Sequence, residues 1–159
     1  MTAAAHFNKR TYNLPTFFRH TGKLLRHPGY LLGALTGRRV SRRFAERLML
    51  AVTQVNRCKY CSYAHSRMAL QAGLSADELA ALLEGDLGAA PTGQRPALVF
   101  AQQFAANREQ VDPADWQRLQ QIYGPEAAED ILTILRVITM GNLLGNSLDA
   151  VLWRLRGGK

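Results

Sequence analysis

Helical periodicity constrains the fold of this chain more than any other feature. Apolar residues recur three and four positions apart along most of the sequence, and no run of alternating β-branched residues is long enough for a convincing strand. Ser41, Ser75 and Asp112 stand where helices would begin, and Gly73 and Gly124 stand where helices would end. The pattern predicts an all-α fold of about seven or eight helices packed around one core.

Short turns separate the expected helices. Ser75 and Glu78 form an S-x-x-E capping box, the segment GAAPTGQ is the clearest loop, and HPG at 27–29 breaks the first helical region. A short apolar piece, YLLGAL, follows that break, and the last helix could loosen at Gly141 or Gly145. We expect the longer helices at about 15–26, 41–55, 58–73, 76–86, 96–109, 114–124 and 126–154.

The length of 159 residues fits one domain with a real core. We expect a single domain over residues 1–159, with a basic N-terminal helical extension at 1–40 and a cysteine-containing core motif at 41–85. The most apolar segment, ILTILRVITMGNLLGNSLDAVLW, contains Arg136, Asn142, Asn146 and Asp149, which favours a buried helix over a membrane span. The start, MTAAAHFNKR, does not resemble a signal peptide, so we expect a cytoplasmic protein.

The net charge of +8 is concentrated near the N-terminus. Residues 1–47 hold ten Lys or Arg and the single acid Glu46, and the remainder of the chain is close to neutral. Such a segment could contact nucleic acid or a membrane surface. No nucleic-acid motif accompanies the charge, so we favour a solvated basic face, which acids of a neighbouring subunit could pair with.

Both cysteines of the chain lie in one short stretch, RCKYCSYAHSR, at residues 57–67. Cys58 and Cys61 are three positions apart, and His65 follows four positions later. On a helix these spacings put all three side chains on one face, which continues into apolar residues. A metal site, a structural disulfide and a thiol redox centre are the three explanations to weigh.

The first two explanations lack support elsewhere in the sequence. A structural zinc site needs about four ligands, and the remaining histidines, His6, His20 and His27, are far away in the basic segment. Haem attachment would need a histidine where Ser62 stands. A structural disulfide would close a very small loop in a chain expected in a reducing compartment. We therefore expect no metal and no cofactor.

A redox pair fits the pattern better. A helix N-terminus favours a thiolate, and a second thiol three residues away can close a reversible disulfide. His65 can give or take a proton on the same face. Glu46, on the preceding helix, is a further candidate as a base in packed surroundings. The alternative for Glu46 is an early-helix acid paired with Arg42 or Arg43.

The segment from about Ser41 to Gly85 resembles the core of the alkylhydroperoxidase D-like family, within the carboxymuconolactone decarboxylase superfamily. The resemblance rests on a glutamate twelve residues before a C-x-x-C and a histidine four residues after the second cysteine. Glu46, Cys58, Cys61 and His65 match that pattern position by position. Asn142 and Asn146 are also similar to asparagines of the family's last helix.

The resemblance implies an all-helical fold, assembly as a trimer or hexamer, and thiol-dependent reduction of hydroperoxides by an external dithiol or protein reductant. It implies that Cys61 attacks the peroxide, that Cys58 resolves, and that Glu46 and His65 relay protons. The helix dipole alone would instead favour Cys58 as the thiolate. The decarboxylase branch lacks the cysteine pair, so lactone chemistry is not expected.

One position departs from the prototype peroxidase, which carries a histidine just before the second cysteine. Tyr60 stands there, and a phenol with a reference pKa of about 10 is a poor base near neutral pH. Two other functions stay open from the residues. One is thiol–disulfide exchange with a partner protein, and the other is non-enzymatic binding through the basic segment.

Overall fold

The computed structural model describes residues 7–26 and 28–157, except the side chains of Ala34 and Leu35. His6 lies outside these residues, and so does His27, the first residue of the expected break at 27–29. Pro28 and Gly29 of that break open a new helix. All regular structure in the described ranges is helical, which confirms the predicted fold class. The elements are α1 (Leu14–Leu25), α2 (Pro28–Thr36), α3 (Arg42–Asn56), α4 (Lys59–Gln71), α5 (Ala76–Glu84), a 3-10 turn (Thr92–Gln94), α6 (Arg95–Ala106), α7 (Pro113–Tyr123) and α8 (Pro125–Leu155).

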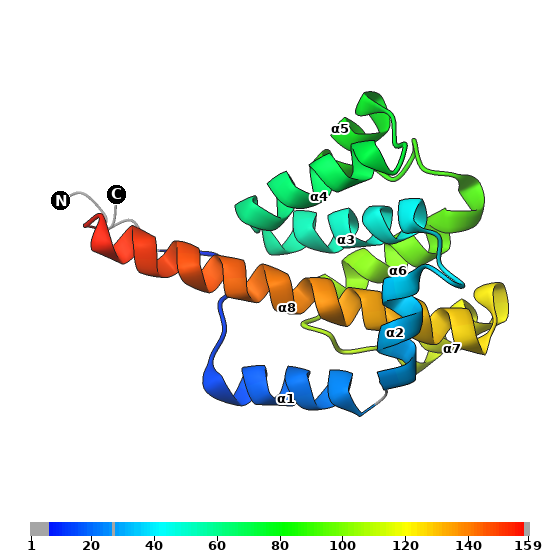
Figure 1. Cartoon of the computed structure of the whole chain (residues 1–159), viewed down its shortest axis with the longest axis horizontal. Coiled ribbons are helices and arrows are strands. Elements are labelled where there is room, and N and C mark those ends of the chain that lie inside the picture. Colours follow the sequence, from blue (N-terminus) through cyan, green and yellow to red (C-terminus); the bar gives the residue numbers. More distant parts are fainter. Residues whose placement is uncertain (1–6, 27, 158–159) are drawn as a thin grey trace.

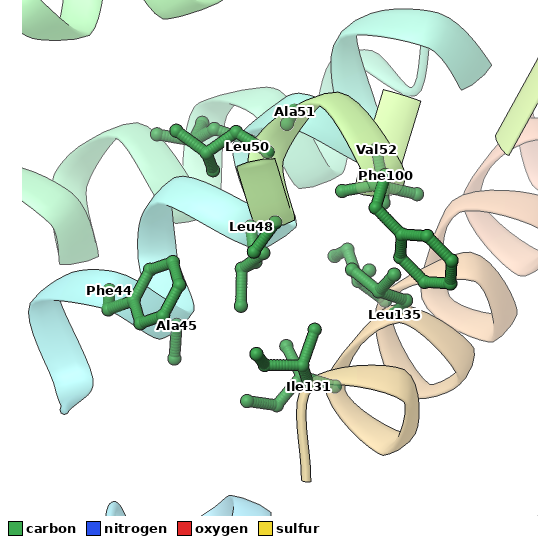
Figure 2. Close-up of a cluster of buried hydrophobic side chains, with 14 of the residues drawn as sticks. Phe44, Ala45, Leu48, Leu50, Ala51, Val52, Phe100, Ile131 and Leu135 are labelled. Carbon is green, nitrogen blue, oxygen red and sulfur yellow. The ribbon is translucent and has the colours of Figure 1, made fainter. Parts of the chain in front are cut away.

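Helix α3 lies at the centre of the fold and packs against α4, α5, α6 and α8 (Figure 1). It begins where expected, because the hydroxyl of Ser41 accepts a hydrogen bond from the backbone N–H of Phe44. Its apolar residues are buried nearly all round, as expected for a helix with neighbours on every side. Figure 2 shows Leu48 and Val52 of this helix meeting Ile131 and Leu135 of α8 in the core.

Helix α8 is the longest element and crosses the whole molecule (Figure 1). It runs without interruption through Gly141 and Gly145, so the expected loosening there is wrong. By length and hydropathy α8 could cross a membrane, a test that the core helix of a soluble protein also passes. In this fold, 56% of its most apolar window is buried against the rest of the chain.

The capping box before α5 is half formed. The hydroxyl of Ser75 accepts a hydrogen bond from the backbone N–H of Glu78 at 3.1 Å, as predicted. The carboxylate of Glu78 does not return to Ser75. It accepts two hydrogen bonds from the buried guanidinium of Arg47 on α3, at 2.5 Å and 3.0 Å. A buried cation needs a charged partner more than an exposed helix start needs a second cap, and this ion pair ties α5 to α3.

The basic N-terminal region pairs partly with acids of the same chain. Lys9 lies 2.7 Å from the carboxylate of Asp149, and Arg10 lies 2.6 Å from that of Glu109. Arg39, after α2, pairs with Glu126 and with the buried Asp130 of α8. Part of the positive charge therefore holds the N-terminal segment and α2 against the helical body.

Candidate redox site

The cysteine pair sits where the chain turns from α3 into α4. Arg57 adopts the left-handed conformation, with φ 56° and ψ 36°, and ends α3. Cys58 follows in an extended conformation as the N-cap of α4, and its sulfur accepts a hydrogen bond from the backbone N–H of Cys61 at 3.3 Å. Cys58 thus takes the place that Ser, Thr or Asp usually holds at a helix start.

The two sulfurs lie 2.7 Å apart, within hydrogen-bonding distance, and both cysteines are free thiols. Cys58 is only 1% exposed, whereas Cys61 is partly exposed. The helical turn therefore brings both sulfurs together as the spacing predicted. A disulfide between them would need little movement of the backbone.

The sulfurs differ in acidity. The hydrogen bond between the two side chains lowers the pKa of Cys58 to about 6. Backbone N–H groups at the start of α4 add to this effect, and burial opposes it. The same hydrogen bond, together with burial, raises the pKa of Cys61. Near neutral pH the reduced pair therefore carries one negative charge, held mainly on Cys58.

Glu46 and His65 form a second pair beside the cysteines. Glu46 is 2% exposed, and its Oε2 lies 2.8 Å from Nδ1 of His65 on α4. Neither Arg42 nor Arg43, the two alternative partners, pairs with Glu46 in the described residues, and Arg43 instead donates a hydrogen bond to the backbone carbonyl of Ala72. A buried carboxylate without a partner would be costly, so His65 makes the burial of Glu46 tolerable. This contact leaves Nε2 of His65 available for proton exchange.

The two pairs are neighbours and are not joined directly. Across residues 7–26 and 28–157, no hydrogen bond connects His65 to either sulfur. The amide of Asn142 on α8 lies close enough to Cys61 to oppose the rise in its pKa. Proton exchange between His65 and the thiols therefore requires a small shift of a side chain or an intervening water molecule.

Two asparagines of α8 anchor the turn that carries the cysteines. Asn142 donates to Thr53 at 3.0 Å and accepts from Asn56 at 3.2 Å. Asn146 donates to the backbone carbonyl of Asn56 at 2.8 Å. All four side chains are buried. Sequence reasoning missed Thr53 and Asn56, although amides within the most apolar helix were a signal that they needed polar partners.

Gly145 of α8 makes room for the sulfurs. A Cβ at this position would lie 2.6 Å from the Cys58 sulfur and 3.7 Å from the Cys61 sulfur. A Cβ at Gly141 would meet only the Cys61 sulfur, at 4.0 Å, which is an ordinary contact. Gly145 therefore lets α8 approach the redox pair closely, a role that its place within a helix did not reveal.

Tyr60, the departure from the prototype, lies at the rim of the site. Its side chain is 38% exposed, and the ammonium of Lys59 lies 5.1 Å from the centre of its ring. Lys59 also pairs with Asp149 of α8 and, together with Lys9, lowers the pKa of that carboxyl. Tyr60 thus forms a side wall of the site next to Gly145.

The described residues offer little for a metal ion. Within them, no group of three or more His, Cys, Asp or Glu side chains is placed to hold one.

Comparison with known proteins gives one family. The model of the carboxymuconolactone decarboxylase family matches residues 24–107, more than half of the chain. The chain belongs to the carboxymuconolactone decarboxylase family. That family includes enzymes, alkylhydroperoxidases and carboxymuconolactone decarboxylases among them. No curated protein and no solved structure matches the chain significantly.

The match contains all four predicted site residues and ends at the start of the loop after α6. Helix α8 lies beyond it, although this helix supplies Asn142 and Gly145 to the site. The segment that carries the family pattern is therefore completed by a helix outside the matched region.

Proposed function

We propose that this protein is a thiol peroxidase that reduces organic hydroperoxides through a reversible Cys58–Cys61 disulfide. The observation that carries the proposal is the pair of free sulfurs 2.7 Å apart at a helix start, one of them with a pKa of about 6. A thiolate is available near neutral pH, and a second thiol is already in place to resolve a sulfenic acid.

The proposed cycle has two oxidative steps. The pair's thiolate attacks the peroxide, the O–O bond breaks, one sulfur becomes a sulfenic acid, and the alkoxide leaves with a proton as the alcohol. The second sulfur then attacks the sulfenic acid, the disulfide forms, and the hydroxyl leaves as water. The two sulfurs together lose two electrons, and the peroxide gains them.

Glu46 and His65 would act as the general acid–base pair of this cycle. Nδ1 of His65 is occupied by Glu46, so the ring is held in one orientation with Nε2 free. In its imidazolium form the ring could give the proton on Nε2 to the departing alkoxide, which would remove the cost of expelling a strong base, and the ring would then regain a proton from solvent. We further propose that an external dithiol or a protein reductant restores the thiols by thiol–disulfide exchange.

The roles of the two sulfurs are a separate prediction. The family resemblance implies that Cys61 attacks and Cys58 resolves, and the greater exposure of Cys61 supports this. The lower pKa of Cys58 supports the opposite assignment. A proton needs to cross only the 2.7 Å between the sulfurs to move the charge from one to the other.

Thiol counting tests the function. Reduced protein is mixed with a slight excess of an organic hydroperoxide, and free thiols are titrated over time. We expect the loss of two thiols per chain and their recovery with a dithiol. If the number of free thiols does not change under excess peroxide and the protein reacts rapidly with disulfide substrates, the peroxidase proposal is wrong. The function would then be thiol–disulfide exchange.

Single variants then assign the roles. Cys58→Ser and Cys61→Ser each keep one sulfur, and a sulfenic acid trap such as dimedone labels the sulfur that attacks. Under the role implied by the family, the label forms in Cys58→Ser and is absent from Cys61→Ser. The reverse result would give the attack to Cys58.

A further inference from the structure

A hollow of about 230 Å³ opens beside the cysteine pair. Cys58 forms part of its wall, with Arg57, Lys59, Thr53 and Leu83 among its neighbours there. The volume is below the roughly 300 Å³ at which pockets for drug-sized ligands begin. The hollow therefore suits a small molecule that approaches Cys58 from the side of Arg57.

The hollow carries an uncompensated positive charge. The ammonium of Lys59 is paired with Asp149, so its charge is largely offset. Among the described residues, no carboxylate lies within ion-pairing distance of the guanidinium of Arg57. A small molecule in the hollow would therefore meet one free cation next to the redox pair.

The neighbouring surface strengthens this field. Arg57 also borders a second hollow, of about 310 Å³, whose wall includes Lys9, Arg10 and Arg108. Lys9 and Arg10 have acidic partners, whereas Arg108, like Arg57, has none among the described residues. Two free guanidinium groups on adjoining hollows favour an anion over a neutral or cationic ligand.

The backbone at Arg57 is a further indication. With φ 56° it occupies the left-handed region, where glycine is the residue without a steric penalty. An arginine at this position carries a backbone cost that a glycine would avoid. Arg57 is thus a residue type that the turn itself does not require, and it lines the same hollow as Cys58.

We propose that Arg57 binds the anionic group of the substrate, and that the redox pair therefore prefers small hydroperoxides bearing a carboxylate over neutral ones. The substrate class rests on the proposed peroxidase function, whereas anion selection at the hollow does not. A molecule held at Arg57 would lie in the hollow that Cys58 also lines.

The first test measures anion selection without a peroxide. Reduced protein is alkylated with iodoacetate and with iodoacetamide, which are similar in size and differ in charge. The ratio of the two rates is compared among the wild type, Arg57→Gly, Arg57→Lys and the control Arg118→Gln, whose arginine lines a different groove. We expect the ratio to fall about fivefold in Arg57→Gly, as for the loss of one nearby unit charge, and to be kept in Arg118→Gln and largely kept in Arg57→Lys. Arg57→Gly suits the left-handed backbone, so it should fold.

The second test uses cumene hydroperoxide and its 4-carboxylate. The ratio of their rates of thiol oxidation should favour the carboxylate in the wild type and should fall in Arg57→Gly. If the wild type and Arg57→Gly give equal ratios in both tests, the inference about Arg57 is overturned. The proposed peroxidase function would still stand if both peroxides oxidise the thiols. If neither peroxide reacts, the substrate class fails with the proposed function, and a fall in the alkylation ratio would still support an anion site at Arg57.

Discussion

At the scale of single residues, the chemistry of the reduced site depends on how one negative charge is shared between two sulfurs. Cys58 holds it because its sulfur is hydrogen-bonded to the Cys61 side chain and also accepts a hydrogen bond from the backbone N–H of Cys61. A helix start supplies such N–H groups to any acceptor at its cap. The hydrogen bond between the two side chains is the largest cause of the difference in pKa between the sulfurs, and the backbone N–H groups at the cap add to it.

The pH dependence of alkylation tests this charge distribution. In the wild type we expect the rate of the first alkylation to rise with pH through a midpoint near 6, since the thiolate is the reactive form. Cys61→Ala removes the largest cause of the low pKa, so the midpoint of Cys58 should move up toward the ordinary cysteine value. Rates are measured with iodoacetamide, and peptide mass spectrometry locates the label. A wild-type midpoint at the ordinary value of about 8.5 would contradict the prediction.

A second prediction concerns Glu46. Glu46→Gln keeps a hydrogen-bond acceptor for His65 and removes the charge that the imidazole faces. If the pair moves protons during turnover, oxidation of the thiols by a hydroperoxide should slow by about 10²-fold, at the lower end for lost general acid–base catalysis. Stopped-flow measurements across pH are compared with those for Glu84→Gln, an exposed acid on α5. If the rate of thiol oxidation and its pH profile are unchanged in Glu46→Gln, Glu46 has only a structural role.

At the scale of elements, the site depends on how closely α8 approaches α4. Only a glycine at 145 permits this approach, because a Cβ there would overlap the Cys58 sulfur. The asparagines on the same helix hold the preceding turn in register with it. Helix α8 therefore acts as the wall against which the redox pair is assembled.

Paired glycine substitutions test that role. Gly141→Ala should stabilise the fold by up to about 1 kcal/mol, because it removes a glycine from a helix interior without a clash. Gly145→Ala gains the same propensity and should still lose about 1–2 kcal/mol net, since it forces the buried sulfur to move. Denaturant unfolding gives the stabilities, and the rate of disulfide closure should fall in Gly145→Ala alone. Equal behaviour of the two variants would argue against close contact.

At the scale of the whole molecule, the C-terminal end of α8 extends beyond the other helices (Figure 1). Four of its apolar side chains are half-exposed or more, namely Leu144, Leu148, Val151 and Leu155. Their spacing of four, three and four positions puts them in one stripe of the kind that pairs with another helix. This stripe is a candidate surface for the trimer or hexamer that the family resemblance implies.

Self-association through the stripe can be measured directly. We expect the wild type to sediment as an oligomer and Leu148→Glu to shift toward the monomer mass, because a charge at the centre of an apolar interface costs several kcal/mol when buried. The control Ile122→Glu introduces the same charge on α7, in place of an apolar side chain of similar exposure, and should leave the mass unchanged. A monomeric wild type would contradict the predicted assembly.

Local patterns in the sequence determined most of the elements. Ser41, Ser75 and Asp112 cap α3, α5 and α7 as predicted, because a helix start depends on a side chain reaching a backbone N–H a few residues away. The spacing of Cys58, Cys61 and His65 also placed their side chains on one helical turn, which follows from helix geometry alone.

Tertiary structure decided the contacts between distant segments. Glu46 pairs with His65 and not with a nearby arginine because of the way α3 packs on α4. Glu78 pairs with Arg47 because α3 holds that guanidinium in a buried position next to α5. The glycine that admits the sulfurs and the asparagines that anchor their turn come from α8, more than eighty residues away. The periodicity of apolar residues predicts which face of a helix is buried. It does not predict which residues of other helices pack against that face.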